Sequence, residues 1–217
     1  MDLDLRLFER DTRGTHLTAA GRALLEDVRG LLRAAAAVER RAHDAAGQRT
    51  FTIGFTPGVL ITPAIRELSH RHPDVSVALV RSDWIHQTAV IRDGQVDVGY
   101  LRLPTDVRGL AVQPLFSEPR VVMLPAEPEW RDIALELRGK QARRAIPRLR
   151  TIEEKLEYIA AGNGIVVLPL SAATFYHRPG ITHALIGDIA PSPVCVAWDR
   201  SRHSALIDEY VAIVLGS

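Results

Sequence analysis

The chain has 217 residues, of which 47% are hydrophobic and 24% charged, a globular composition that excludes wholesale disorder. With 27 basic and 26 acidic side chains the formal net charge is +1, so any contact with nucleic acid must come from a local patch. A single cysteine excludes a disulfide framework within this sequence and a cysteine zinc site, and it favours a reducing, cytoplasmic location.

Membrane association is not expected. The sequence shows no signal peptide, and its longest apolar run, residues 165–170, is too short to span a bilayer.

A long helix without proline is predicted over residues 19–46, with Thr18 as its N-cap. Apolar residues recur in it at alternating spacings of four and three, the heptad pattern of a helix that packs against a partner helix. The heptad positions are Leu24, Val28, Leu31, Ala35, Val38 and Ala42. A helix about 42 Å long cannot bury this stripe on so small a domain, which favours dimerisation. The alternative is a long amphipathic helix that lies on its own domain.

The residues just ahead of this helix form an arginine-containing turn. Arg10 and Arg13 could reach DNA phosphates or a narrow minor groove, and the helix start at Thr18 offers free backbone N–H groups to a phosphate. A solvated turn explains the same residues equally well.

From residue 50 onward, strands and helices are predicted to alternate. Strands are expected at 51–55, 75–80, 96–100, 120–124, 144–149, 165–168 and 194–198, and helices at 60–70, 85–92, 128–138, 151–161 and 204–215. Strands separated by helices predict a parallel sheet with right-handed crossovers. The pattern repeats in the second half, which indicates an α/β fold of two lobes with a cleft between them.

Ligands of open α/β sheets bind outside the carboxyl ends of the strands, so the strand-end loops are the candidate site. Thr56 brings a hydroxyl beside a helix that Gly58 is expected to open, and Arg102 could bind an anion bidentately, most simply a carboxylate. Trp84, Leu60 and Leu103 would supply an apolar wall. The alternative is that Thr56 is only an N-cap and Arg102 a surface charge.

No catalytic or metal-binding constellation is found, so neither enzyme activity nor a cofactor is expected. The histidines are scattered, no phosphate-binding loop precedes a helix, and Cys195 lies in an apolar strand, where we expect a buried small side chain rather than a redox sensor. The basic residues between 131 and 150 are interpreted as a solvated surface, with contact to DNA or to an acidic effector as the alternative.

Residues 7–21, Leu-Phe-Glu-Arg-Asp-Thr-Arg-Gly-Thr-His-Leu-Thr-Ala-Ala-Gly, resemble the end of the winged helix-turn-helix of LysR-type transcriptional regulators. The shared pattern is L-F-x-R, a short arginine-containing wing, and L-T-x-A-G opening a linker helix. The resemblance implies DNA contacts from Arg10, Arg13, Thr15 and Thr18, a linker-helix dimer and an effector-binding domain. Residues 1–5 resemble only the tail of the helix-turn-helix, so no base-reading residue is predicted.

Residues 51–55, 93–102 and 159–169 are similar to the LysR-type effector domain, whose fold is like that of type 2 periplasmic binding proteins. The sequence departs from the family after residue 127, where the family carries a further segment of the second lobe. The resemblance implies pocket roles for Thr56 and for the loops at 83–84 and 101–102. Together with the strand-end loops, the candidate effector-binding residues are Thr56, Pro57, Gly58, Val59, Leu60, Asp83, Trp84, Leu101, Arg102 and Leu103. The expected division is a wing at 1–17, a linker helix at 18–47, lobe I at 50–118 completed by 199–217, and lobe II at 119–198.

These features predict a ligand-responsive transcription regulator that binds promoter DNA as a dimer or tetramer and a small carboxylate effector between its lobes. Two alternatives remain: a small-solute-binding protein without a DNA-binding role, and a headless paralogue that dimerises with a full-length regulator and inactivates it.

Overall fold

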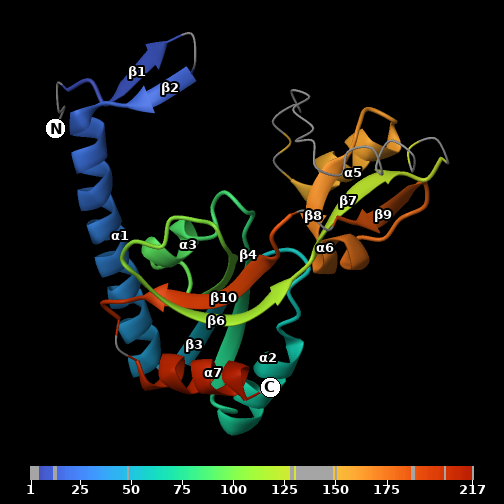
Figure 1. Cartoon of the computed structure of the whole chain (residues 1–217). Helices are drawn as coiled ribbons and strands as arrows, with labels where there is room; N and C mark the ends of the chain where they lie inside the picture. The colour runs from blue at the N-terminus through green and yellow to red at the C-terminus, as the bar shows by residue number, and fades with distance from the viewer. Residues whose placement is uncertain are drawn as a thin grey trace.

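The computed structural model describes residues 5–11, 14–47, 49–127, 130, 149, 151–186, 189–202 and 204–216. These residues form a hairpin, a long helix and two α/β lobes (Figure 1). Of the helix and strand predicted at 128–138 and 144–149, only residues 130 and 149 are described, and the basic side chains between 131 and 150 lie outside the described residues.

The hairpin, called the wing below, consists of β1 (Phe8–Asp11) and β2 (Gly14–Leu17), which pair antiparallel. It leads directly into α1 (Ala19–Ala45). The Thr18 hydroxyl accepts a hydrogen bond from the Gly21 N–H at 2.9 Å and donates one to the carbonyl of Arg6 at 2.8 Å. The predicted N-cap is therefore confirmed, and it also ties the wing to the helix.

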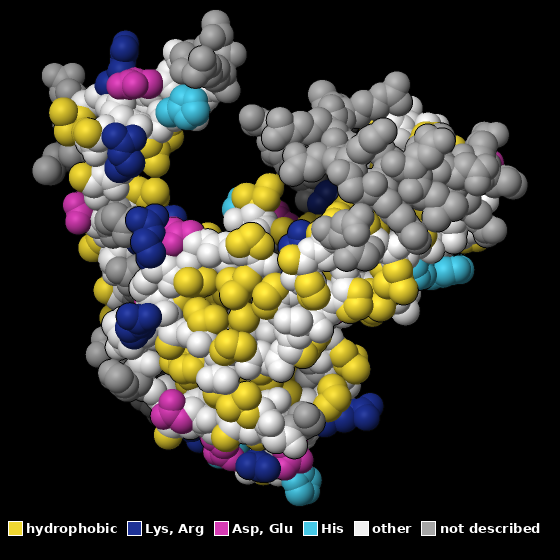
Figure 2. Space-filling model, viewed as in Figure 1, with side chains coloured by type: hydrophobic (Ala, Val, Ile, Leu, Met, Phe, Trp, Pro, Cys, Tyr) yellow, Lys and Arg dark blue, Asp and Glu magenta, His cyan; other side chains and the backbone are white. Residues whose placement is uncertain are grey.

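The heptad residues of α1 reach the surface of the chain. Leu31 is 70% exposed and Val38 57% exposed, while Leu24 is half-buried. Yellow hydrophobic side chains accordingly appear along α1 in Figure 2. Although α1 contacts lobe I, the chain leaves most of the described heptad residues exposed.

Lobe I is built on a five-stranded sheet of order β4-β3-β5-β10-β6. Its elements are β3 (Arg49–Phe55), α2 (Thr62–Arg71), β4 (Val75–Arg81), α3 (Ala89–Arg92), β5 (Val98–Arg102), β6 (Leu110–Glu118), β10 (Ser192–Asp199) and α7 (Ala205–Leu215). The strands β4, β3 and β5 are parallel as predicted, whereas β10 runs antiparallel to β5 and β6. The late strand, which the sequence division placed with lobe II, thus lies in the sheet of lobe I.

The two faces of this sheet bury alternate residues of each strand. Tyr100, Val194 and Val196 pack in the cluster covered by α2 and α7, while Leu101 and Cys195 pack in the cluster beside α3. Because successive side chains along a strand point to opposite faces of the sheet, consecutive residues such as Tyr100 and Leu101 pack in different clusters. The expectation that Cys195 is buried is confirmed.

Lobe II holds a three-stranded sheet of order β8-β7-β9, and its pairings are antiparallel. Its elements are β7 (Arg120–Pro125), α5 (Ile152–Ala160), β8 (Val166–Pro169), α6 (Leu170–Phe175) and β9 (Ile181–Leu185). The expectation of a parallel sheet is wrong for this lobe, because β7 lies between β8 and β9, and both run opposite to it. The chain passes between the lobes at Pro119, after β6, and again between β9 and β10.

Candidate functional site: a cationic cavity between the lobes

Arg102 lies at the centre of a hydrogen-bonded cluster where the two lobes meet. Its Nε donates to Glu118 Oε1 at 3.0 Å, its Nη1 to the Thr56 hydroxyl at 2.7 Å, and its Nη2 to the Ser171 hydroxyl at 2.9 Å. Thr56 follows β3 and Arg102 ends β5, and these strands are parallel neighbours, so their carboxyl ends meet at one edge of the sheet. The predicted proximity of Thr56 and Arg102 is thereby observed as a direct hydrogen bond.

Glu118 supplies a carboxylate that the sequence analysis did not place in the site. It is 6% exposed at the end of β6, and its Oε2 accepts a hydrogen bond from the Ser171 backbone N–H at 2.8 Å. Burial lowers the pKa of Arg102, and the charge of Glu118 opposes this effect. Thr56, Arg102 and Glu118 from lobe I are thus joined to Ser171 at the start of α6 in lobe II.

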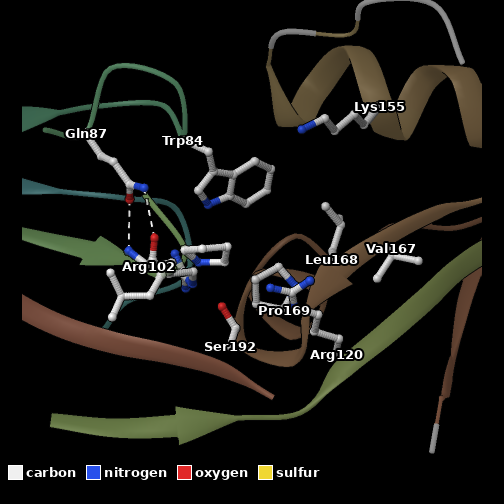
Figure 3. A pocket seen from close by; sticks show the side chains of 11 residues that line it. Trp84, Gln87, Arg102, Arg120, Lys155, Val167, Leu168, Pro169 and Ser192 are labelled. Carbon is white, nitrogen blue, oxygen red and sulfur yellow. Dashed lines mark hydrogen bonds between the residues drawn. The ribbon is translucent and has the colours of Figure 1, made fainter. Parts of the chain in front are cut away.

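A cavity of about 260 Å³ opens beside this cluster (Figure 3). Its lining residues are Trp84, Gln87, Arg102, Leu103, Pro104, Arg120, Lys155, Val167, Leu168, Pro169 and Ser192. Gln87 fixes one wall, since its side-chain amide both donates to the carbonyl and accepts from the N–H of Arg102. Residues of both lobes therefore face the same space.

The charged side chains that line the described part of the cavity are basic, and one of them, Arg102, is ion-paired with Glu118. Arg102, Arg120 and Lys155 line it, and no carboxylate does so among the residues that the structure describes. The Lys155 ammonium lies 4.1 Å from the centre of the Trp84 ring, and Figure 3 shows the lysine extending from α5 toward the indole. Burial lowers the pKa of Lys155, against the charges of Asp83 and Glu154. These contacts favour an anion in the cavity.

Trp84 adds an unsatisfied donor. Its indole Nε1 is buried and has no hydrogen-bond partner within the described part of the chain. A buried N–H without an acceptor is costly, so an acceptor atom of a bound ligand would relieve this cost.

The implied effector-binding residues divide into two groups. Trp84, Arg102 and Leu103 line the cavity, and Thr56 is fully buried behind Arg102. Leu101 and Val59 are buried in the cores of lobe I, Leu60 is 76% exposed, and Pro57 is buried in the turn that follows β3.

Asp83 turns toward its own backbone rather than toward the cavity. Its Oδ1 accepts hydrogen bonds from the N–H groups of Ile85 and His86, at 2.9 and 2.8 Å, and its carboxylate also pairs with the His86 ring. This is the usual local bonding of an aspartate that starts a turn. The helix expected from residue 85 accordingly begins later, at Ala89.

Gly58 is a contact between the lobes rather than the start of a helix. The expected helix opening at Gly58 is wrong, because α2 begins at Thr62 with Pro63 in its first turn. Gly58 has a φ of +84°, and a Cβ at this position would lie 2.6 Å from the backbone nitrogen of Ala172 in α6. Only a glycine permits this turn to pack so closely against lobe II.

Eight cavity residues are absent from the predicted site, and the polar ones among them are Gln87, Arg120, Lys155 and Ser192. The sequence did offer a reason to consider Arg120, because it is a basic residue at the first position of a predicted strand. Lys155 occupies the second turn of a predicted helix, and nothing in the helical pattern indicated that this turn faces lobe I.

The predicted DNA contacts lie on or near the wing. Arg10 on β1 and Thr15 on β2 are exposed, Thr18 caps α1, and Arg13 lies outside the described residues. No group of three or more potential metal ligands occurs among the residues with described positions. Within the same residues, no helix is long and apolar enough to cross a membrane.

Comparison with known proteins identifies the class. A sequence profile described as the LysR substrate binding domain matches residues 44–136. The Hca operon transcriptional activator HcaR of Escherichia coli K12 is 25% identical, over 96% of this chain and 81% of that protein. A probable hydrogen peroxide-inducible genes activator of Mycobacterium xenopi is 30% identical, over 57% of this chain and 68% of that protein.

Solved structures share the fold. OxyR of Corynebacterium glutamicum, as a C206 mutant, aligns over 99% of this chain and 79% of its own with a TM-score of 0.59 and 23% identity. Full-length CbnR in complex with its target DNA aligns over 98% of this chain and 84% of its own, with a TM-score of 0.56 and 21% identity. The BenM effector binding domain with its effector benzoate aligns over 76% of this chain and 90% of its own, with a TM-score of 0.58 and 19% identity.

The fold is that of a two-lobed LysR effector-binding domain, preceded here by the long helix α1. The chain belongs to the LysR family of transcriptional regulators, proteins that bind DNA and small-molecule effectors and are not enzymes.

Proposed function

We propose that this chain is a DNA-binding regulator controlled by a small carboxylate bound in the interlobe cavity. The observation that carries the proposal is the convergence of Arg102, Arg120 and Lys155 on one cavity whose described lining contains no acidic side chain. Arg120 and Lys155 belong to lobe II and Arg102 to lobe I. A carboxylate held by both sets would favour one arrangement of the lobes over others, as an effector must.

The size of the cavity supports a small ligand. About 260 Å³ is slightly below the roughly 300–1,000 Å³ that is usual for pockets of drug-sized ligands. The neighbour BenM has benzoate as its effector, and benzoate combines a carboxylate with one ring. The apolar wall of Leu103, Pro104 and Val167 suits such a ring.

The ligand proposal is tested by calorimetric titration of the full chain with small carboxylates, beginning with benzoate, and with benzamide as an uncharged match. We expect carboxylates to bind and benzamide to bind at least about tenfold more weakly, since a hydrogen bond to a charged group contributes about 1.5–3 kcal/mol. Arg120→Gln and Lys155→Gln should weaken binding similarly. Arg178→Gln, on the surface of lobe II, is the matched control. Equal effects from all three variants would overturn the assignment of the cavity.

We propose further that two chains associate through α1, with a tetramer as the larger assembly. The support is the row of exposed apolar residues at heptad spacing, including Leu31 and Val38. Leu31→Glu should convert the assembly to a species of 23.9 kDa in sedimentation velocity. Ala23→Glu adds the same charge at an exposed position outside the heptad row and should leave the assembly intact. A wild-type chain that sediments as a monomer would refute this part.

DNA binding is assigned to the wing, and its partner is double-stranded promoter DNA in the cytoplasm. Arg10 is exposed on β1 and can contact a phosphate. In gel-shift titrations with the DNA upstream of the chain's own gene, Arg10→Ala should weaken binding. It should also reduce the slope of the logarithm of the binding constant against the logarithm of the salt concentration by about one unit. Arg66→Ala on α2 is the control. Binding that is unchanged by Arg10→Ala would place the DNA contact elsewhere.

A further inference from the structure

A second cavity, of about 680 Å³, lies where α1 meets lobe I. Four arginines from four separate segments line it: Arg29 of α1, Arg92 at the end of α3, Arg108 in the loop before β6, and Arg200 in the turn after β10. Its other lining residues are Asp106, Gly109, Asp199 and Ser201. Figure 1 shows α3 and the end of β10 facing α1, and in Figure 2 dark blue side chains occur along this edge of the molecule.

Two of these arginines, Arg92 and Arg200, are held in position by backbone carbonyls of lobe I. Arg92 donates from Nη2 to the carbonyl of Asp106 at 2.6 Å and from Nε to the carbonyl of Arg108 at 3.1 Å. Arg200 Nη2 donates to the carbonyl of Leu110 at 3.1 Å. Arg29 lies across the junction, with its Nε 3.5 Å from Asp93 Oδ1. Positioned guanidinium groups lose little further freedom when they bind a ligand.

The lining carries more positive than negative charge. Among the described residues, four guanidinium groups and two carboxylates, Asp106 and Asp199, line the cavity, and a third carboxylate, Asp93, pairs with Arg29 beside it. The Asp106 carboxylate lies between Arg92 and Arg108, and its hydrogen bonds with Arg108 hold its pKa well below the ordinary value. Asp199 Oδ1 accepts hydrogen bonds from the N–H and hydroxyl of Ser201. The excess charge favours an anion at this junction.

Phosphate is the anion that this geometry fits. A carboxylate offers two oxygens in one plane, whereas a phosphate group presents oxygens in several directions and binds guanidinium groups on different sides. The volume also leaves room for more than a single phosphate, because small-molecule sites commonly measure about 300–1,000 Å³.

We propose that this cavity binds a phosphate-bearing small molecule and thereby ties the linker helix to lobe I. Arg29 belongs to α1, while Arg92, Arg108 and Arg200 belong to lobe I, so a phosphate bound by both sets contacts α1 and the lobe at once, beside the ion pair of Arg29 with Asp93. A bound phosphate bridges them and favours the arrangement in which α1 lies against the lobe. This site is separate from the interlobe cavity and uses none of its residues.

The test is calorimetric titration of the full chain with inorganic pyrophosphate at low salt. We expect saturable binding, weakened at least about tenfold by Arg29→Gln or Arg200→Gln and unchanged by Arg66→Gln, an exposed arginine on α2. Arg29→Lys keeps the charge and should retain most of the binding, which separates a binding role from a structural one. Thermal unfolding of each variant confirms that it is folded.

Three results would overturn the proposal: no saturable binding by the wild-type chain, an equal loss in Arg66→Gln, or a loss in Arg120→Gln without one in Arg29→Gln. The last result would place the anion in the interlobe cavity instead, so failure here is distinguishable from failure of the carboxylate proposal.

Discussion

Arg102 and Glu118 form an ion pair with Nε and Oε1 3.0 Å apart, and both side chains are less than a tenth exposed. The pair lies where the chain leaves lobe I, and Ser171 of lobe II bonds to both members of the pair. Two charges out of water are tolerated only when their remaining hydrogen bonds are also made. The same bonds join the lobes, so a motion of α6 away from β5 must break them.

Glu118→Gln should therefore lower the free energy of unfolding by about 3–5 kcal/mol, because it leaves the Arg102 guanidinium buried without its counter-charge. Urea unfolding followed by circular dichroism measures the change. The matched control is Glu153→Gln, which removes the half-exposed partner of Arg81 and should cost no more than about 1 kcal/mol. Equal losses in the two variants would show that the buried pair contributes no more than a surface pair.

Much of lobe I was predictable because local pattern and register agree there. Thr56 and Arg102 were both assigned to the site because each lies at the carboxyl end of a predicted strand, and the structure makes these two strands parallel neighbours. Glu118 was not assigned to the site, because its strand β6 contains Pro114 and a proline argues against a strand. The structure resolves this conflict. β6 is an edge strand, and the register shift in its pairing with β10 falls next to Pro114.

Lobe II was less predictable for a different reason. α6 follows β8 without a turn, and its six residues are too short for a helical period to emerge. Ser171 and the cation Lys155 acquire their roles only from the placement of α5 and α6 against lobe I. That placement depends on tertiary contacts such as the one between Gly58 and Ala172, which no local pattern encodes.

Gly21→Ala should loosen the wing. Gly21 is buried in the first turn of α1, and a Cβ there would lie 2.2 Å from the Leu7 carbonyl oxygen, the acceptor of the Thr18 N–H. The chain at Leu7 must shift to relieve this contact. Limited trypsin digestion should then cleave after Arg10 about tenfold faster, since local opening exposes the site. Ala23→Ser, at an exposed position two residues away, should digest at the wild-type rate, and an unchanged rate in Gly21→Ala would refute the contact.

Lys155 should titrate below the ordinary lysine value of 10.5, because burial disfavours its charged form. The sequence contains one other lysine, Lys140, so ¹³Cε NMR of the labelled chain should resolve two titrations, with Lys155→Arg identifying the lower one. Two identical titrations at the ordinary value would contradict the buried position of Lys155.

The sign of the pH effect follows from the lowered pKa. The folded state favours neutral Lys155, so a small destabilisation is fully present below the lowered pKa and is lost as the pH rises from that value to the ordinary lysine value of 10.5. An anion in the cavity prefers the ammonium form. Affinity for benzoate should therefore be highest below the lowered pKa and decline as the pH rises through it. A flat profile for the wild-type chain, or the same decline in Lys155→Met, would exclude Lys155 as a ligand contact.

Cys195 should not respond to hydrogen peroxide in the native chain, although relatives of the chain are named as peroxide-inducible activators. Its side chain is fully buried in the hydrophobic cluster that contains Leu101 and Leu110, and burial raises the pKa of the thiol, whereas peroxide attacks an exposed thiolate. Because the sequence contains one cysteine, a disulfide within this sequence is also excluded.

Native protein should leave Ellman's reagent unreacted and keep its mass after exposure to peroxide. The same protein in concentrated guanidinium chloride should react fully with Ellman's reagent. Cys195→Ala should bind benzoate and DNA as the wild type does. Oxidation of native Cys195 at the rate of the unfolded chain would instead show that β10 opens readily, and would make the thiol a sensor.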